Sequence, residues 1–430
     1  MSLPKPREKV MLAGSDTIPI TPASAAAMVA EGVVVGYAPG FESLAGITPQ
    51  LDTTATPGNV SNVAMIWLND TESGSPGAND RPTNATAAIA ALTPLVSSGK
   101  LASDAIVNFN CESPHHNDLS SSMAYTATAT QIANWEASRD SWIAVLQGVK
   151  AEFPQMKVGI WGLPYVPAAP ALMSAGAQGG SWAIPSLVGT GFYANEASKL
   201  ANEEAYIEEM IDRLEPVIEA SDYIDSRVYP NYGYRDDGER GGALNWPPVA
   251  NNNDYGRSRD QAFLKAVLRI GSGLKKRTGK PHYACMKPSW TSHDANAAFW
   301  IDELITDDLW AGIVDDVCAH GVDGIYVWWS YRLLDYAFST TPTTVAQANE
   351  FDPVSVRELF RLSWVDARGA TPTLDITDES YWTSASNKAA AYELVSNKIS
   401  DRMALTVRSA RRANLRHAAK NSTLASLIGG

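Results

Sequence analysis

The sequence predicts an α/β fold: a TIM-type (β/α) barrel, seven-stranded, with a helical C-terminal extension. Short apolar runs alternate with amphipathic helical stretches along most of the chain. Strands that alternate with helices pair in parallel, because each helix carries the chain back before the next strand begins. Seven such units in a row favour a closed barrel. A doubly wound open sheet is the alternative, but no glycine-rich phosphate loop follows the first run.

The seven expected strands are nearly continuous in apolar residues, as is typical of parallel strands that are buried on both faces. They are VVVGY (33–37), VAMIWL (63–68), AIVNFN (105–110), KVGIWG (157–162), IDSRVY (224–229), PHYACM (281–286) and GIYVWW (324–329). Between them, apolar residues recur at intervals of three and four, which predicts helices; the clearest cover residues 135–153, 202–220 and 257–277.

Three regions follow from this pattern. Residues 1–30 are expected to form an arm and a helix, in which Thr21 is the N-cap and Pro22 the first helical residue. Residues 31–345 form the barrel, and residues 346–430 form the helical extension.

The extension contains a long helical tract, residues 384–419, whose end is basic. Between residues 401 and 420 it has six positive side chains against the single acid Asp401. Such a face can dock on the acidic body of the same chain. It can also tether the chain to an acidic partner, as in a homo-oligomer or a larger assembly.

Composition excludes several classes of protein. A net charge of −13 over 430 residues argues against nucleic-acid binding by the main body. The sequence contains no run of about 18 apolar residues, so it does not predict a membrane span. The N-terminus MSLPKPREKVML lacks the apolar region of a signal peptide, so we expect a cytoplasmic protein, or one released as part of a larger assembly. The three cysteines, Cys111, Cys285 and Cys318, lack the spacing of a zinc site or a disulfide framework.

The third expected strand runs into the polar sequence IVNFNCESPHHND (106–118), which holds the main candidate site. Strand side chains alternate between faces, so Asn108, Asn110 and Glu112 share one face, which we expect to point into the barrel. Glu112 would then lie highest, at the C-terminal mouth, where barrel enzymes place their sites. A carboxyl group in a partly apolar mouth has a raised pKa, as a general acid requires.

Asn110, two residues before Glu112, fits a particular mechanism. In substrate-assisted glycoside hydrolysis, the N-acetyl oxygen of the sugar attacks the anomeric carbon while a glutamate protonates the leaving oxygen. A neighbouring amide or acid orients the acetamido group, and the spacing i, i+2 on a strand puts both groups on one face. Asp70, which follows the second strand, is a further candidate to face inward. The structural alternative for Glu112 is a carboxylate that caps the next helix or forms a salt bridge in the loop.

Two other chemistries fit the sequence less well. Glu112, His115, His116 and Asp118 are close in sequence and His282 begins the sixth strand, but no HxxxH or HExxH spacing of a metal site exists. No GxSxG elbow for Ser-His-Asp catalysis follows a strand. We therefore expect no metal and no cofactor.

Taken together, the segments resemble the hyaluronidase family of glycoside hydrolases. NFNCESP is similar to the family's Asp-x-Glu strand end, and GVDGIYVWWSY is similar to its last strand. The resemblance implies a seven-stranded barrel in which Glu112 is the acid and Asn110 stands where the family has its acetamido-orienting Asp. It also implies that the site tyrosine lies near Tyr165 and that Trp328 forms the floor.

Two departures from the family pattern matter. Asn replaces Asp at position 110, although endo-β-N-acetylglucosaminidases use an Asn-x-Glu pair for the same purpose. A second alignment register places Asn108 and Asn110 over the family's Asp and Glu, which would leave a barrel without its acid. The family is also typically secreted and disulfide-bonded, and this sequence has neither feature.

The sequence therefore predicts a glycoside hydrolase that acts on a polysaccharide or glycan containing N-acetylhexosamine. Glu112 and Asn110 are the expected catalytic residues. The expected substrate-binding residues are Asp70, Tyr165, Tyr229, Trp290 and Trp328. The alternatives are a non-catalytic carbohydrate-binding or structural assembly component, for example of a virion, and a metal-dependent barrel hydrolase.

Overall fold

The computed structural model describes most of the regular secondary structure of the chain. The described residues are 9–14, 22–35, 61–67, 85–99, 101–110, 129–164, 196–228, 252–288, 307–329 and 377–428, together with Leu119, Ala337, Phe338 and Arg357. Statements about structure below refer to these residues.

The strands form two parallel sheets. One has the order β2-β1-β8-β7-β6 and the other the order β3-β4-β5. Every strand pair is parallel. The strands are β1 (Lys9–Gly14), β2 (Val33–Val35), β3 (Ser61–Trp67), β4 (Leu101–Asn110), β5 (Lys157–Ile160), β6 (Ile224–Val228), β7 (His282–Met286) and β8 (Gly324–Trp329).

The two sheets meet at both ends. The backbone N–H of Asp225 in β6 donates to Leu163 O at 3.2 Å, and that of Arg227 donates to Pro164 O at 3.0 Å, so β6 joins the segment that follows β5. At the other end β2 lies beside β3. The strands therefore follow one another in chain order around a TIM-barrel-like arrangement. Because no ladder of hydrogen bonds joins β2 to β3 in the described residues, the closed barrel itself stays a prediction.

The N-terminal region differs from the expectation. All seven expected strands are present, but residues 9–14 of the predicted arm form an additional strand, β1, between β2 and β8. The expected number of seven strands was therefore too low. KVMLAG is a short run that follows a charged segment. Of its two pairing partners, β8 is remote in sequence and β2 is very short, so the local sequence pattern did not reveal this strand. The boundary expected at residue 345 lies outside the described residues.

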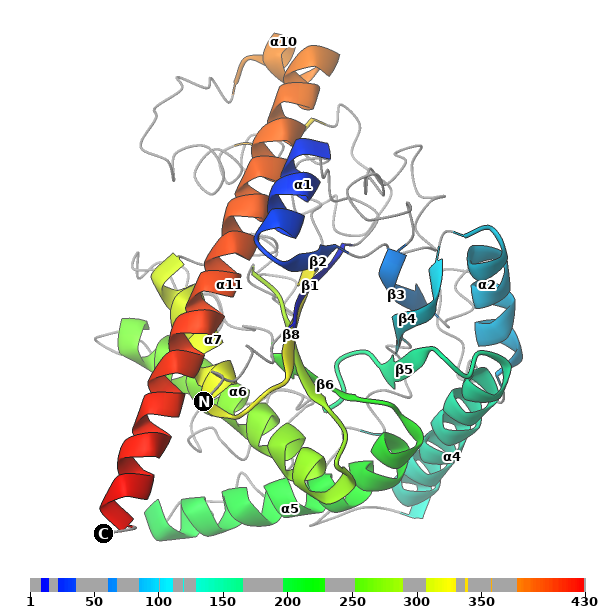
Figure 1. The fold of residues 1–430 in the computed structure, drawn as a ribbon, viewed down its shortest axis with the longest axis vertical. Helices are drawn as coiled ribbons and strands as arrows, with labels where there is room; N and C mark the ends of the chain where they lie inside the picture. Colours follow the sequence, from blue (N-terminus) through cyan, green and yellow to red (C-terminus); the bar gives the residue numbers. More distant parts are fainter. Residues whose placement is uncertain are drawn as a thin grey trace.

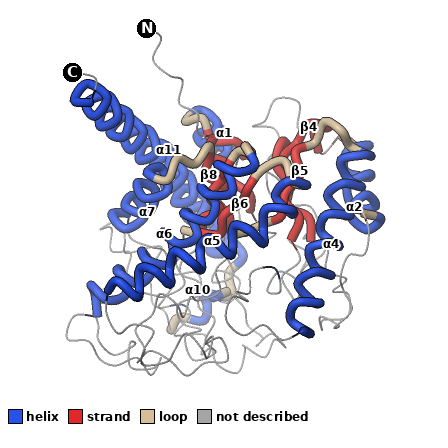
Figure 2. The backbone as a smooth tube through the Cα atoms, turned by 90° about the horizontal axis from the view of Figure 1, so that it is seen from below, coloured by secondary structure: helices blue, strands red, loops and turns tan. Residues whose placement is uncertain are grey.

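Helices surround the strands, as Figures 1 and 2 show. The expected helices are present, and α4, α5 and α6 begin earlier than the periodicity suggested. The helices are α1 (Pro22–Ala30), α2 (Thr86–Ser97), α4 (Ala129–Glu152), α5 (Glu196–Ala220), α6 (Asn252–Thr278), α7 (Asp307–Ala319), α10 (Glu379–Trp382) and α11 (Ala385–Ile428). None of the described helices is both long and apolar enough to cross a membrane.

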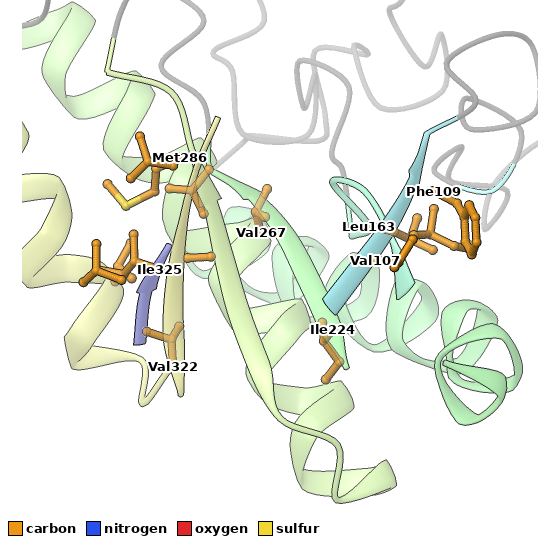
Figure 3. Close-up of a cluster of buried hydrophobic side chains, with 14 of the residues drawn as sticks. Val107, Phe109, Leu163, Ile224, Val267, Met286, Val322 and Ile325 are labelled. Carbon is orange, nitrogen blue, oxygen red and sulfur yellow. The ribbon is translucent and has the colours of Figure 1, made fainter. Parts of the chain in front are cut away.

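The apolar core includes residues from both the strands and the surrounding helices. Figure 3 shows part of it, including Met286 of β7, Ile325 of β8 and Val267 of α6, all of which are fully buried. Each aliphatic side chain of this kind contributes roughly 1.5–3 kcal/mol through removal of apolar surface from water. This core fixes the direction in which the opposite face of each strand points.

Helix α11 docks on the body of its own chain, against α7 and α1 (Figure 1). Its inner face is buried at Val395, Ile399, Met403, Val407 and Ala410, which recur at intervals of four and three residues. The spacing matches one stripe of an α-helix, so packing and periodicity agree.

Polar contacts of α11 also go to the same chain. Arg402 donates to Asp307 of α7 at 2.9 Å, and Arg416 donates to Asp315 at 2.6 Å. The basic helix was expected either to dock on the acidic body of its own chain or to tether the chain to a partner. These contacts show docking on its own chain.

Candidate functional site

The residues expected to form the site follow the parallel strands, and most lie outside the described part of the chain. Asn110 is the last residue of β4 and pairs in register with Trp67; Trp328 lies in β8 and pairs with Ala13. The side chains of these two are not among those described. Glu112, Asp70, Tyr165, Tyr229 and Trp290 fall outside the described residues.

The described residues do show which face of β4 is polar. Val107 and Phe109 are fully buried members of the apolar core, and Asn108 between them lies on the opposite face. The predicted alternation of β4 is therefore confirmed at Asn108.

Strand β6 shows where that opposite face lies. A Cβ on Gly271 of α6 would lie 2.3 Å from His282 Nε2 and 2.4 Å from Ser226 Oγ, so His282 and Ser226 face α6. Asp225 and Arg227 alternate with Ser226 and thus face away from that helix, into the interior enclosed by the sheets.

Four buried polar residues meet in this interior: Asn108 of β4, Tyr223 just before β6, Asp225 of β6 and Tyr326 of β8. We call them the interior polar cluster. Each is at most 2% exposed. A barrel interior is normally filled by branched apolar side chains, so four polar side chains there need a specific account.

Tyr223 ties the cluster to β4. Its hydroxyl lies 2.6 Å from Asn108 Oδ1 and 2.8 Å from Val107 O, and donates toward both acceptors. Its ring lies over Gly159 of β5, where a Cβ would come within 2.7 Å of two ring carbons. Glycine at position 159 is therefore what makes room for the ring.

Asp225 is the ionisable group at the centre of the cluster. Its Oδ2 accepts from the backbone N–H of Gly162 at 3.3 Å. Burial raises the pKa of the Asp225 carboxyl well above its ordinary value, and the hydrogen bond from Gly162 and the nearby Asn108 amide only partly oppose this. None of the groups that shift this pKa is a cation, so the neutral form of the carboxyl is favoured compared with that of an exposed aspartate.

Several cluster atoms have no hydrogen-bond partner within the described part of the chain. They are Asp225 Oδ1, Asn108 Nδ2 and the Tyr326 hydroxyl. The Asn108 amide is nonetheless near enough to lower the pKa of both Asp225 and Tyr326, against a larger upward shift from burial. The cluster is thus compact but incompletely satisfied, which is costly in an apolar interior.

Asp222, three residues before Asp225, provides a contrast. Its Oδ2 accepts from the backbone N–H of Val158 in β5 at 3.0 Å, and its Oδ1 lies 2.8 Å from Lys150 Nζ. Both aspartates therefore hold the β5 region to β6, but only Asp222 has an ion-pair partner shown by the geometry.

A second buried polar pair lies on the helix side of the sheet. His282 Nε2 lies 2.7 Å from Ser226 Oγ, and burial lowers the pKa of His282 to about 3, so the imidazole is neutral. Asp323 accepts from the His282 backbone N–H and not from its ring, so these residues do not form a catalytic triad. The described residues contain no group of three or more His, Cys, Asp or Glu side chains that could hold a metal ion.

Sequence reasoning did not single out Tyr223 or Asp225. The signal was present in IDSRVY, where Asp225 and Arg227 alternate with Ile224, Ser226 and Val228 in a strand expected to be buried on both faces. An acid at such a position must be paired or neutral.

Comparison with known proteins adds a distant relation. No family model matches the chain, and no curated protein sequence matches it. Among solved structures, bee venom hyaluronidase in a monoclinic crystal form is 12% identical, with a TM-score of 0.43, over 83% of this chain and 98% of that one. The likeness is structural and distant. A second structure, bee venom hyaluronidase in complex with a hyaluronic acid tetramer, is 13% identical, with a TM-score of 0.33, over 63% of this chain and 78% of that one.

Proposed function

We propose that the chain is a glycoside hydrolase that cleaves a glycan containing N-acetylhexosamine, with Glu112 as general acid and base. Asn110 orients the acetamido group of the sugar. The proposal places the site at the C-terminal ends of the parallel strands, where enzymes of this architecture carry their catalytic groups.

The burial of Asn108 is the observation that carries this assignment. Two registers of β4 compete: one uses Asn110 and Glu112, and the other uses Asn108 and Asn110. Asn108 is 1% exposed and its carbonyl oxygen accepts from Tyr223, so it cannot reach a glycan. This supports the register that keeps Glu112 as the acid.

The proposed substrate-binding residues are assigned to the edge formed by the C-terminal ends of the strands. Asp70, Tyr165, Tyr229 and Trp290 each come shortly after a described strand or its immediate continuation, and Trp328 lies within β8. Because the strands are parallel, their C-terminal ends share one edge. Aromatic residues at that edge suit the apolar faces of sugar rings.

The proposed reaction has two steps. In the first, the acetamido oxygen bonds to the anomeric carbon while the glycosidic C–O bond breaks, and Glu112 gives its proton to the leaving oxygen. In the second, Glu112 takes a proton from water, which attacks the anomeric carbon and releases the acetamido oxygen. Asn110 holds the acetamido group in line for both steps.

The test is Glu112→Gln, assayed on a panel of N-acetylhexosamine glycans. We expect kcat to fall by about 10²–10⁴-fold, because general acid catalysis typically contributes that much. Glu152→Gln, at an exposed position at the end of α4, is the matched control and should leave kcat unchanged. Equal activity of wild type and Glu112→Gln would refute the assignment.

A further inference from the structure

We propose that Asp225 is a positioning residue for this site, and that its buried carboxyl group holds together the strands that carry the proposed catalytic groups. The inference rests on the proposed function, but its first test does not require a substrate.

Asp225 lies where three elements meet. Its backbone N–H donates to Leu163 O at 3.2 Å and its Oδ2 accepts from Gly162 N–H at 3.3 Å, which holds the segment after β5 against β6. On its other side is Asn108 of β4, whose amide shifts the pKa of the carboxyl. Asp225 thus ties the segment after β5 to β6 through its backbone and its side chain, with Asn108 of β4 close by.

Two segments next to Asp225 lead directly into the proposed site. Pro164, held by Arg227 N–H at 3.0 Å, immediately precedes Tyr165 in the chain. Asn108 is two residues before Asn110 and four before Glu112. A shift of the Asp225 carboxyl would therefore be transmitted to both segments.

Burial favours the neutral form of the carboxyl, and the titratable groups that face it are as follows. Tyr223 and Asp222 come just before β6, Tyr283 and Cys285 lie on the same face of β7, and Tyr326 lies on that face of β8. Arg227 is the cation on this face of β6, and its guanidinium lies over the Trp161 ring, 5.1 Å from the ring centroid. Ionisation would leave Oδ1 as a buried charge, and the strands would have to part to solvate it.

The first test compares the stability of wild type with that of Asp225→Asn. Near pH 4 the carboxyl is largely neutral in the folded protein and about half neutral in the unfolded one, whose pKa is about 3.9. As the pH rises, only the unfolded chain ionises, so wild type loses stability until the raised folded pKa is passed. Asparagine keeps an acceptor for Gly162 N–H and does not ionise.

We therefore expect Asp225→Asn to have a higher denaturant midpoint than wild type at pH 7, with a difference that shrinks toward pH 4. Asp222→Asn is the matched control. It should lower the midpoint at pH 7, because Lys150 loses its partner. In wild type itself, the infrared absorption of a protonated carboxyl group should persist above the pH at which an exposed aspartate has ionised. A midpoint for Asp225→Asn equal to or below that of wild type, or absence of the infrared band, overturns the neutral carboxyl whatever the enzyme cleaves.

The second test measures kcat against pH for the glycan that wild type cleaves. We expect kcat of wild type to fall at alkaline pH where Asp225 ionises, and Asp225→Asn to retain kcat through that range with KM little changed. A merely stabilising role would shift the denaturant midpoints and leave the two pH profiles of kcat superimposed, which would overturn the positioning role. Cleavage of no glycan by wild type would refute the proposed function and this role with it, while the first test still decides the state of Asp225.

Discussion

At Gly159, the absence of a side chain decides where a neighbouring aromatic ring can lie. Tyr223 covers the position that a Cβ would occupy, and its hydroxyl is fixed at the far end by Asn108 and the backbone of β4. The ring has no room to move away without breaking these hydrogen bonds. One glycine on β5 thus supports the interior polar cluster.

We expect Gly159→Ala to destabilise the protein by about 1–3 kcal/mol, the usual cost of inserting a methyl group into a close-packed core. Chemical denaturation checks this. Gly312→Ala is the control: its Cβ would meet no atom within 4 Å in α7, so alanine should stabilise the helix by up to about 1 kcal/mol. Similar midpoints for the two variants would contradict the close contact at Gly159.

At the residue scale, the sequence predicted the polar face of β4 but not its partners. Asn108 could be assigned to one face because its neighbours Val107 and Phe109 are apolar. Nothing local linked it to Tyr223, more than a hundred residues away, since that contact depends on how β4, β5 and β6 align. The assignments of Glu112 and the substrate-binding residues remain predictions.

At the scale of the elements, strands and helices with long apolar patterns were predictable, because burial of one face imposes a period. The long C-terminal helix is an example: its buried residues recur every three or four positions from Val395 to Ala410. Strand β1 was not predictable in this way, because six residues hold too little pattern. This segment is recognised as a strand because it pairs with β2 and β8, and that pairing is seen only in the folded chain.

The docked face of α11 leads to a prediction about stability. Met403 is fully buried, so we expect Met403→Ala to cost about 2–5 kcal/mol in unfolding free energy, as for other large-to-small core substitutions. Arg412→Ala on the exposed face of the same helix should change it by no more than about 0.5 kcal/mol. Thermal or urea denaturation compares the two. A small effect of Met403→Ala would mean that α11 detaches at little cost.

At the scale of the whole molecule, α11 bears on the alternative that this chain is an assembly component. Its apolar stripe and three of its arginines, Arg402, Arg411 and Arg416, are engaged with the same chain. A tether to another molecule would have to use the remaining exposed face, where Arg408 and Arg412 lie.

We expect the double variant Arg408→Glu, Arg412→Glu to have the same molar mass as wild type, measured by light scattering over a range of concentrations. The reason is that the contacts that engage this helix are internal. The matched variant Arg416→Glu, which breaks the contact with Asp315, should lower stability without changing the mass. A fall in mass on reversing Arg408 and Arg412 would instead assign that face to self-association.

Strand β1 also constrains the order of events during synthesis on the ribosome. It pairs with β8, which is translated more than three hundred residues later. Until β8 has been translated, one edge of β1 has no hydrogen-bonding partner, and such an edge invites pairing with another nascent chain. The interval between translation of β1 and translation of β8 is therefore the period in which this protein most needs a chaperone to shield β1.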